Sequence, residues 1–293
     1  MSNSPLKGIV ALLRLPYWLM TGGLSLLTAF AILKDPLSMS LQTAFLIFFS
    51  MACITSAGFA INDYFDRESD AVIKPKRPIP AGNLTLRQVV AISSILFILG
   101  LSLTYWLPPL SFVILVIDSL VLILYSYLVK KKSGFFANIV VGILTGTAFM
   151  YGQAAISGTI TLISLALYPI AFGTIGGNVL RDVLSVEGDT KVGYPTLPQK
   201  VGNYNATKVG AIFFLLTGLL APLPALPLFA DHFTFYYLPF ILTWSVLLIY
   251  SAIHLFTSGS TIQNVRKYER IVTMSMMLLP LALIVEAIVG WLI

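Results

Sequence analysis

The chain is poor in charged residues. Only 10% of its 293 residues are Asp, Glu, Lys or Arg, whereas 57% are hydrophobic. A soluble globular domain carries about 25% charged residues, so this chain cannot cover a water-facing surface, and a soluble enzyme is excluded. Apolar runs of about 20 residues recur along the sequence, and each is long enough to cross the ~30 Å hydrocarbon core of a bilayer. The composition therefore indicates a polytopic membrane protein.

Cysteine is almost absent as well. The single Cys53 excludes an internal disulfide framework and a metal site built from several cysteines. It stands in an apolar run, which favours a buried, unreactive thiol. The net charge of +6 does not indicate a nucleic-acid partner, because the basic residues stand in short loops between apolar segments.

Nine apolar segments are long enough to span the membrane. We expect helices, because a transmembrane barrel would show ~10-residue segments of alternating polarity. The expected spans are 13–33, 41–61, 89–107, 110–129, 135–156, 161–180, 209–229, 237–257 and 271–293. The predicted fold class is an all-α polytopic membrane protein of nine transmembrane helices, with residues 1–293 forming one domain around a central cavity.

The basic residues orient these spans. The N-terminus and the loops after spans 2, 4, 6 and 8 hold 17 of the 18 Lys and Arg residues, and only Lys34 falls on the other side. The positive-inside rule therefore predicts a cytoplasmic N-terminus and an external C-terminus. Eight of the 12 carboxylates stand on the same side. We expect a multi-pass protein of the cell membrane whose polar chemistry faces the cytoplasm.

The second span runs into an acidic motif. Asn62, Asp66 and Asp70 stand at i, i+4 and i+8, so they share one face of a continuing helix. Like charges at this spacing repel one another, and a bound cation would remove that repulsion. Oxygen ligands without nearby cysteine or histidine suit Mg²⁺, which favours one or two carboxylates together with substrate phosphate oxygens. The motif therefore predicts a metal-bridged diphosphate.

The sixth span ends in a second acidic motif. A shift of 119 positions places Asp63 on Asp182, Asp70 on Asp189 and Asp66 on Ser185, which indicates a weak internal repeat with two acidic helix ends at one cavity. Asn62, Asp66, Asp70, Asp182 and Asp189 are the candidate metal ligands. Basic side chains nearby are candidates to neutralise the diphosphate: Lys74, Arg77, Lys131 and Arg181. Taken singly, each of these charged residues is also compatible with an ordinary interfacial position.

These residues resemble the signatures of the UbiA family of intramembrane prenyltransferases. The first signature is Asn62 to Asp70 followed by Arg77 to Pro80, and the second is Arg181 to Asp189 followed by Thr196-Leu197-Pro198. A Tyr-x-x-x-Lys element is matched by Tyr127 and Lys131, although Tyr125 and Lys130 leave its register open. Many family members have an aspartate where this chain has Ser185, and in this respect the chain is similar to the chlorophyll synthase branch.

The resemblance implies a Mg²⁺-dependent transfer of an isoprenyl group from its diphosphate to a lipophilic acceptor. It implies catalytic roles for Asp66, Asp70, Asp182, Asp189, Arg77, Lys131 and Tyr127, and diphosphate contacts for Asn62, Lys74, Arg77, Arg181 and Lys131. With Ser185 in place of an aspartate, its hydroxyl, a water or Glu187 would complete the second site.

The opening Arg14-Leu15-Pro16 is similar to the archaeal branch of the family that attaches a second geranylgeranyl chain to geranylgeranylglyceryl phosphate. An aromatic quinone precursor or a chlorophyllide remains open as the acceptor.

The positions of the ionisable residues disfavour a cation transporter. A cation transporter would carry its ionisable residues near the bilayer midplane, whereas here they gather at one interface. Asp118 and Glu286 do lie within spans, and we expect both to be hydrogen-bonded between helices rather than catalytic. Asn138, at the start of the fifth span, either lines the cavity or caps its helix.

Overall fold

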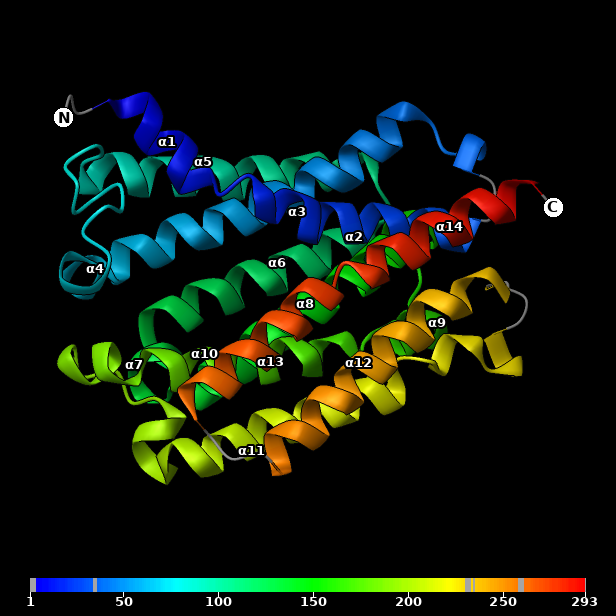
Figure 1. Ribbon diagram of the computed structural model, residues 1–293. Coiled ribbons are helices and arrows are strands. Elements are labelled where there is room, and N and C mark those ends of the chain that lie inside the picture. The colour runs from blue at the N-terminus through cyan, green and yellow to red at the C-terminus, as the bar shows by residue number, and fades with distance from the viewer. Residues whose placement is uncertain (1–3, 34–35, 230–232, 234, 258–260, 293) are drawn as a thin grey trace.

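The computed structural model describes residues 4–33, 36–229, 233, 235–257 and 261–292. Its α-helices form one elongated bundle (Figure 1). The helices are α1 (Pro5–Leu13), α2 (Pro16–Leu33), α3 (Leu41–Phe65), α4 (Arg67–Ile73), α5 (Leu86–Leu103), α6 (Pro109–Leu124), α7 (Lys130–Lys132), α8 (Gly134–Ser157), α9 (Leu162–Leu167), α10 (Ile170–Lys191), α11 (Leu197–Leu220), α12 (Leu238–Thr257), α13 (Ile262–Ser275) and α14 (Leu278–Leu292).

The described residues contain nine helical runs long and apolar enough to cross a membrane, which confirms the predicted number of spans. Several runs start earlier than predicted. The first begins at Pro5, because it includes the short, mostly apolar helix α1. The seventh begins at Leu197 and the ninth at Ile262, because polar helical turns precede their apolar stretches. α1 and the end of α14 lie at opposite ends of the bundle, as an odd number of spans requires (Figure 1). Lys34, the one basic residue expected on the outer side, lies outside the described residues.

Small residues allow the helix backbones to approach closely. A Cβ atom on Gly152 of α8 would lie 2.2 Å from the carbonyl oxygen of Ser25 in α2. A Cβ atom on Gly176 of α10 would lie 2.8 Å from the carbonyl oxygen of Gly210 in α11. Lipid is as apolar as the side chains, so helix association in a membrane depends on such close packing. These contacts hold together the helices that carry the polar end of the bundle.

The isolated polar groups of the spans are buried. Thr147 Oγ1 of α8 donates a hydrogen bond of 2.8 Å to Asp118 Oδ2 of α6, which confirms the expected link between helices. Glu286 is 3% exposed. Cys53 is buried in α3, as expected for an unreactive thiol.

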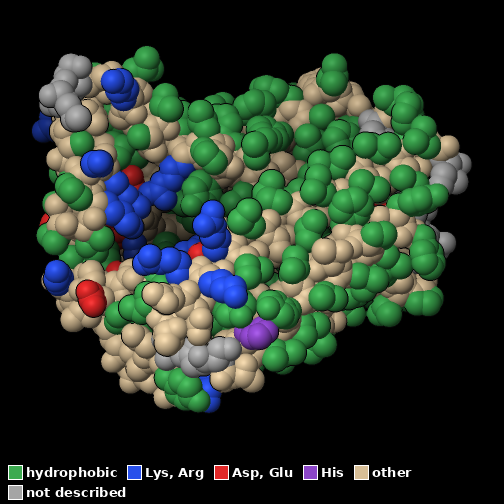
Figure 2. All heavy atoms as spheres, viewed as in Figure 1, with side chains coloured by type: hydrophobic (Ala, Val, Ile, Leu, Met, Phe, Trp, Pro, Cys, Tyr) green, Lys and Arg blue, Asp and Glu red, His purple; other side chains and the backbone are tan. Residues whose placement is uncertain are grey.

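One end of the bundle is strongly polar. Figure 2 shows Lys and Arg side chains around a hollow at that end, whereas hydrophobic side chains cover most of the remaining visible surface. α1, α4 and α7 lie at this end (Figure 1). The fold therefore gathers at one end the charged residues that the sequence distributes over several loops.

Candidate active site

The first acidic motif lies where α3 meets α4. α3 ends at Phe65 and α4 begins at Arg67, so the motif is not one continuous helix as predicted. The backbone N–H of Asp66 nevertheless donates to the Asn62 carbonyl at 2.9 Å, and that of Asp70 donates to the Asp66 carbonyl at 2.8 Å. The i to i+4 spacing is thus kept through the junction. Asn62, Asp66 and Asp70 are all buried.

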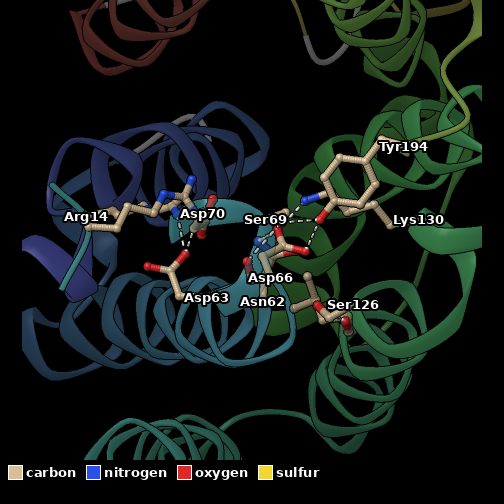
Figure 3. A network of polar contacts seen from close by, with 11 residues as sticks. Arg14, Asn62, Asp63, Asp66, Ser69, Asp70, Ser126, Lys130 and Tyr194 are labelled. Atoms are coloured by element: carbon tan, nitrogen blue, oxygen red, sulfur yellow. Dashed lines mark hydrogen bonds and ion pairs between the residues drawn. The ribbon is translucent and has the colours of Figure 1, made fainter. Parts of the chain in front are cut away.

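Asp66 is the centre of a network (Figure 3). Its Oδ2 accepts hydrogen bonds from Asn62 Nδ2 at 2.9 Å and from Lys130 Nζ. Its Oδ1 accepts a hydrogen bond of 2.7 Å from the Tyr194 hydroxyl. The Tyr194 hydroxyl also lies 2.9 Å from Ser69 Oγ of α4. Donors from three distant parts of the chain therefore hold the Asp66 carboxylate in one orientation.

Two arginines hold the other carboxylates of the motif. Asp63 Oδ1 accepts hydrogen bonds of 2.7 Å from both Arg14 Nη2 and Arg77 Nη1. The same Arg77 nitrogen lies 2.7 Å from Asp70 Oδ2. Arg77 thus bridges Asp63 and Asp70, and the basic loop that follows the motif folds back onto it.

Lys130 approaches from the opposite side, after a π-helical turn at Tyr125–Val129. Such turns add one residue to a helical turn and occur frequently at functional sites. The extra residue changes the register, so Lys130 reaches Asp66. Lys131 instead lies 5.8 Å above the Phe65 ring, and Tyr127 packs beside the same ring at 5.5 Å. In this structure Lys130 contacts Asp66 and Lys131 contacts the Phe65 ring.

The second motif lies on a continuous helix, α10. Asp182 Oδ2 accepts a hydrogen bond of 2.7 Å from Asn138 Nδ2, so Asn138 of α8 contacts the acidic motif. Ser185 Oγ donates a hydrogen bond of 2.6 Å to Asp189 Oδ2, one helical turn further on. Asn138 and Ser185 therefore hold the two carboxylates of the second motif.

Some predicted residues lie elsewhere. Arg181 Nε pairs with Glu269 of α13 at 3.0 Å, and its Nη1 donates to Asn178 Oδ1 at 2.9 Å. These contacts give Arg181 a partner outside the acidic network, and its contact with a diphosphate stays a prediction. Lys74 lies in the loop after α4, beside Arg77 and Asp63.

The sequence pattern did not identify Tyr194 or Asp63 as site residues. Tyr194 stands in the loop between α10 and α11, and 128 positions separate it from Asp66. Its one signal in the sequence is that its loop follows the second motif as the Arg77 loop follows the first. Asp63 belongs to the repeat and to the first signature, but the sequence gives it no role as a ligand.

Burial and the neighbouring charges alter the acid–base behaviour of this site. Burial raises the pKa of the Asp70 carboxyl, Arg77 opposes that change, and Asp66 and Asp63 add to it. Burial and the nearby Asp66 carboxylate raise the pKa of the Tyr194 hydroxyl, which therefore stays protonated. Tyr194 is thus a permanent hydrogen-bond donor to Asp66.

The donor atoms fit Mg²⁺ in their chemistry. All of them are carboxylate, amide or hydroxyl oxygens. Asn62 Oδ1 is buried and has no hydrogen-bond partner among the described residues, which leaves an oxygen of the motif available as a ligand. Within the described parts of the chain no three Asp, Glu, His or Cys groups converge as a ready cluster. Arg77 and Lys130 hold the first-motif carboxylates instead.

The chain is similar to known proteins in both sequence and fold. The model of the UbiA prenyltransferase family matches residues 23–285. Digeranylgeranylglyceryl phosphate synthase of Natronomonas pharaonis is 36% identical over 222 residues, which are 75% of this chain and 78% of the relative. The enzyme of the same name from Methanococcoides burtonii is 38% identical over 210 residues, 70% of this chain and 74% of the relative.

Solved structures have the same fold. A structure of digeranylgeranylglyceryl phosphate synthase superposes with a TM-score of 0.80 and 28% identity, covering 97% of this chain and 99% of the other. A UbiA homologue from Archaeoglobus fulgidus, solved with DMAPP and Mg²⁺, has a TM-score of 0.63 and 21% identity over 94% of this chain and 99% of the other. The chain belongs to the UbiA prenyltransferase family and is a prenyltransferase of the membrane.

Proposed function

We propose that the protein transfers a geranylgeranyl group from geranylgeranyl diphosphate to geranylgeranylglyceryl phosphate, at the cytoplasmic face of the membrane and with Mg²⁺. The observation that carries the reaction is the buried Asp66 carboxylate, which donors from α3, α7 and the Tyr194 loop hold at the polar end of the bundle. The archaeal relatives of that name, 36% and 38% identical, support the choice of acceptor.

The residues have distinct roles in this proposal. Asn62, Asp66 and Asp70 would hold one metal ion and Asp182 and Asp189 a second, with the Ser185 hydroxyl orienting Asp189. Bound Mg²⁺ would neutralise the diphosphate oxygens and stabilise that group as it leaves. Lys130, Lys74 and Arg77 would exchange part of their contacts with carboxylates for contacts with the diphosphate. Tyr194 would keep Asp66 in place while Lys130 moves.

The reaction is a substitution at C1 of the donor. The C1–O bond to the diphosphate breaks and its electron pair leaves with the diphosphate. The acceptor hydroxyl oxygen then bonds to C1 and releases its proton. Fixed cations in a site shielded from bulk water stabilise the negative charge that develops on the leaving group. In this proposal residues 1–293 form a single catalytic domain.

The test is a transfer assay on purified protein with Mg²⁺ and labelled geranylgeranyl diphosphate. Geranylgeranylglyceryl phosphate and 4-hydroxybenzoate are offered in separate reactions. We expect label in the glycerol ether, and loss of at least about 100-fold in kcat/KM for Asp66→Asn, since the variant removes a charge at the reacting group. Glu68→Gln is the matched control, because Glu68 is an exposed carboxylate that pairs, among the described residues, with the neighbouring Arg67 alone.

Two results would contradict the proposal. Label on the ring of 4-hydroxybenzoate would show that the acceptor is an aromatic precursor, as in quinone synthesis. Full activity of Asp66→Asn, with protein as stable as the unmodified chain, would show that the Asp66 carboxylate is not needed for the reaction.

A further inference from the structure

The outer face of α13 is charged, although this helix is part of a membrane span. α13 packs against α10 and α12, and its Val265, Tyr268 and Val272 are buried. Arg266 and Arg270 stand one helical turn apart on the opposite face, and both are exposed. A charged side chain is costly in the hydrocarbon core of a bilayer. This part of α13, which begins at the polar end of the bundle (Figure 1), therefore lies at the level of the lipid head groups.

The two arginines have no carboxylate partner. Neither Arg266 nor Arg270 forms an ion pair among the described residues. Glu269 is the carboxylate next to them in the sequence, but it is held elsewhere. Its Oε1 accepts hydrogen bonds from Arg181 Nε of α10 at 3.0 Å and from Thr273 Oγ1 at 2.9 Å. Because like charges one turn apart destabilise a helix, a bound anion would stabilise this pair of arginines.

An apolar stripe continues from the arginines along the same face. Met274 and Met277 are 65% and 62% exposed. Leu281 and Ile284 of α14 are exposed beyond them. The N–H of Met277 donates to the Met274 carbonyl and that of Leu281 to the Met277 carbonyl, both at 3.3 Å, so helical hydrogen bonding continues across the break between α13 and α14.

The length of this stripe matches one leaflet of a bilayer. At about 1.5 Å per residue, the helix from Met274 to Ile284 is about 15 Å long. That length is half of the ~30 Å hydrocarbon core. A lipid whose head group lies at Arg266 and Arg270 can therefore place its chains along the stripe.

We infer that Arg266 and Arg270 bind the phosphodiester group of an anionic phospholipid, whose chains lie along the stripe from Met274 to Ile284. Guanidinium groups donate paired hydrogen bonds to phosphate oxygens. Basic side chains at the surface of a membrane attract anionic lipids. A phosphatidylcholine brings its own cationic choline group beside the two arginines and is therefore disfavoured. None of these residues belongs to the proposed donor site, so the inference does not rest on the proposed reaction.

The bound lipid also strengthens the contact between α13 and α10. Glu269 stands between the two arginines in the sequence, and it pairs with Arg181, the residue before Asp182 of the second acidic motif. A lipid phosphate neutralises Arg266 and Arg270, so these arginines no longer compete with Arg181 for the Glu269 carboxylate. Anionic lipid therefore stabilises the helix that carries the second motif.

The test is a lipid titration of the purified full chain, followed by native mass spectrometry. Phosphatidylglycerol and phosphatidylcholine with the same acyl chains are titrated separately, so the two ligands differ only in their head groups. The variants are Arg266→Gln and Arg270→Gln. Arg87→Gln is the matched control, because Arg87 of α5 is an exposed arginine that has no second arginine one turn away.

We expect the unmodified chain to bind phosphatidylglycerol more tightly than phosphatidylcholine. Arg266→Gln and Arg270→Gln should each weaken phosphatidylglycerol binding about tenfold, as for loss of one charged hydrogen bond. Arg87→Gln should change it less than about twofold, since an isolated exposed charge contributes little. Phosphatidylcholine binding should be the same in all four chains.

Thermal unfolding in nanodiscs verifies that each variant is folded and supplies a second readout. Adding phosphatidylglycerol to phosphatidylcholine nanodiscs should raise the Tm of the unmodified chain, and should raise that of Arg266→Gln and Arg270→Gln less. Arg270→Lys keeps the charge and loses the paired donors. It should retain more of the phosphatidylglycerol affinity than Arg270→Gln.

Four results would overturn the inference. The first is equal affinity of the unmodified chain for the two lipids, and the second is unchanged phosphatidylglycerol binding by both Arg266→Gln and Arg270→Gln. The third is an equal loss in Arg87→Gln, which would show a general effect of net charge. The fourth is displacement of phosphatidylglycerol by geranylgeranylglyceryl phosphate at equal concentration, which would assign the arginines to the acceptor. Neither Mg²⁺ nor the donor is present, so these outcomes do not depend on the transfer reaction.

Discussion

Lys130 and Lys131 are adjacent lysines with different predicted importance. Lys130 pairs with Asp66, which is 4% exposed, whereas the Lys130 side chain is 24% exposed. Removing one partner of a buried ion pair costs about 3–5 kcal/mol. Because water reaches Lys130, we expect Lys130→Gln to destabilise the fold by only about 1–3 kcal/mol. Asn62 and Tyr194 still donate to Asp66, so the variant should fold.

The larger effect should appear in catalysis. Lys130 contacts Asp66, beside which we propose that the diphosphate binds. Loss of a charged contact of about 1.5–3 kcal/mol lowers kcat/KM by roughly 10- to 100-fold. Lys131→Gln loses a cation–π contact with Phe65, about 0.5–1 kcal/mol at an exposed site, and should lower kcat/KM less than about fivefold.

The assay is steady-state transfer from geranylgeranyl diphosphate by both variants in the same membrane mimetic. Thermal unfolding, followed in parallel, verifies that each variant is folded. If Lys131→Gln lost most of its activity while Lys130→Gln kept it, the register given by the π-helical turn would be wrong, and with it the role of Lys130.

Three further predictions follow from the site and the topology. Tyr194→Phe removes one of three donors to Asp66 and should lower kcat/KM about 5- to 30-fold with little change in the acceptor KM, as steady-state kinetics would show. Because the pKa of Asp70 is raised, its carboxylate is lost at a higher pH than that of an ordinary aspartate; kcat/KM for the donor should therefore begin to fall at that higher pH as the solution is acidified, and a pH profile with an ordinary aspartate limb would contradict this. In a Cys53→Ser background, an impermeant maleimide should label Lys132→Cys only from the cytoplasmic side and Tyr105→Cys only from the outside; the reverse pattern would invert the predicted topology.

Most of the fold could be predicted from the sequence because the relevant signals are local. An apolar run of about 20 residues implies a span by its length alone, and nine such runs were identified without knowledge of their packing. The helix starts were less accurate. α1 carries Lys7, and α11 carries Lys200 in its first turn and Lys208 further along, so these helices extend beyond the segments that the apolar pattern marked.

The site could be predicted where its residues are close together in the sequence. Asn62, Asp66 and Asp70 follow a period of four, which the backbone hydrogen bonds preserve. The Tyr-x-x-x-Lys spacing also follows a period of four and favoured Lys131, but the π-helical turn adds a residue that no sequence signal marks. Tyr194 reaches Asp66 through the tertiary fold alone.

The chain's own cations hold the first acidic motif and give it a definite resting state. The three buried carboxylates Asp63, Asp66 and Asp70 at one helix end would repel one another, and burial would add to that cost. Arg14, Arg77 and Lys130 remove the repulsion in the absence of a metal ion. A metal–diphosphate complex must then compete with these ion pairs for the same carboxylates, and the displaced cations become available to the phosphate oxygens. Mg²⁺ without the diphosphate brings no phosphate oxygens, so the displaced arginine and lysine side chains would gain no new contacts. We therefore expect Mg²⁺ to bind much more tightly together with the donor diphosphate than alone, and calorimetric titration of Mg²⁺ with and without the diphosphate would measure that difference; equal affinities in the two titrations would mean that the ion pairs do not oppose metal binding.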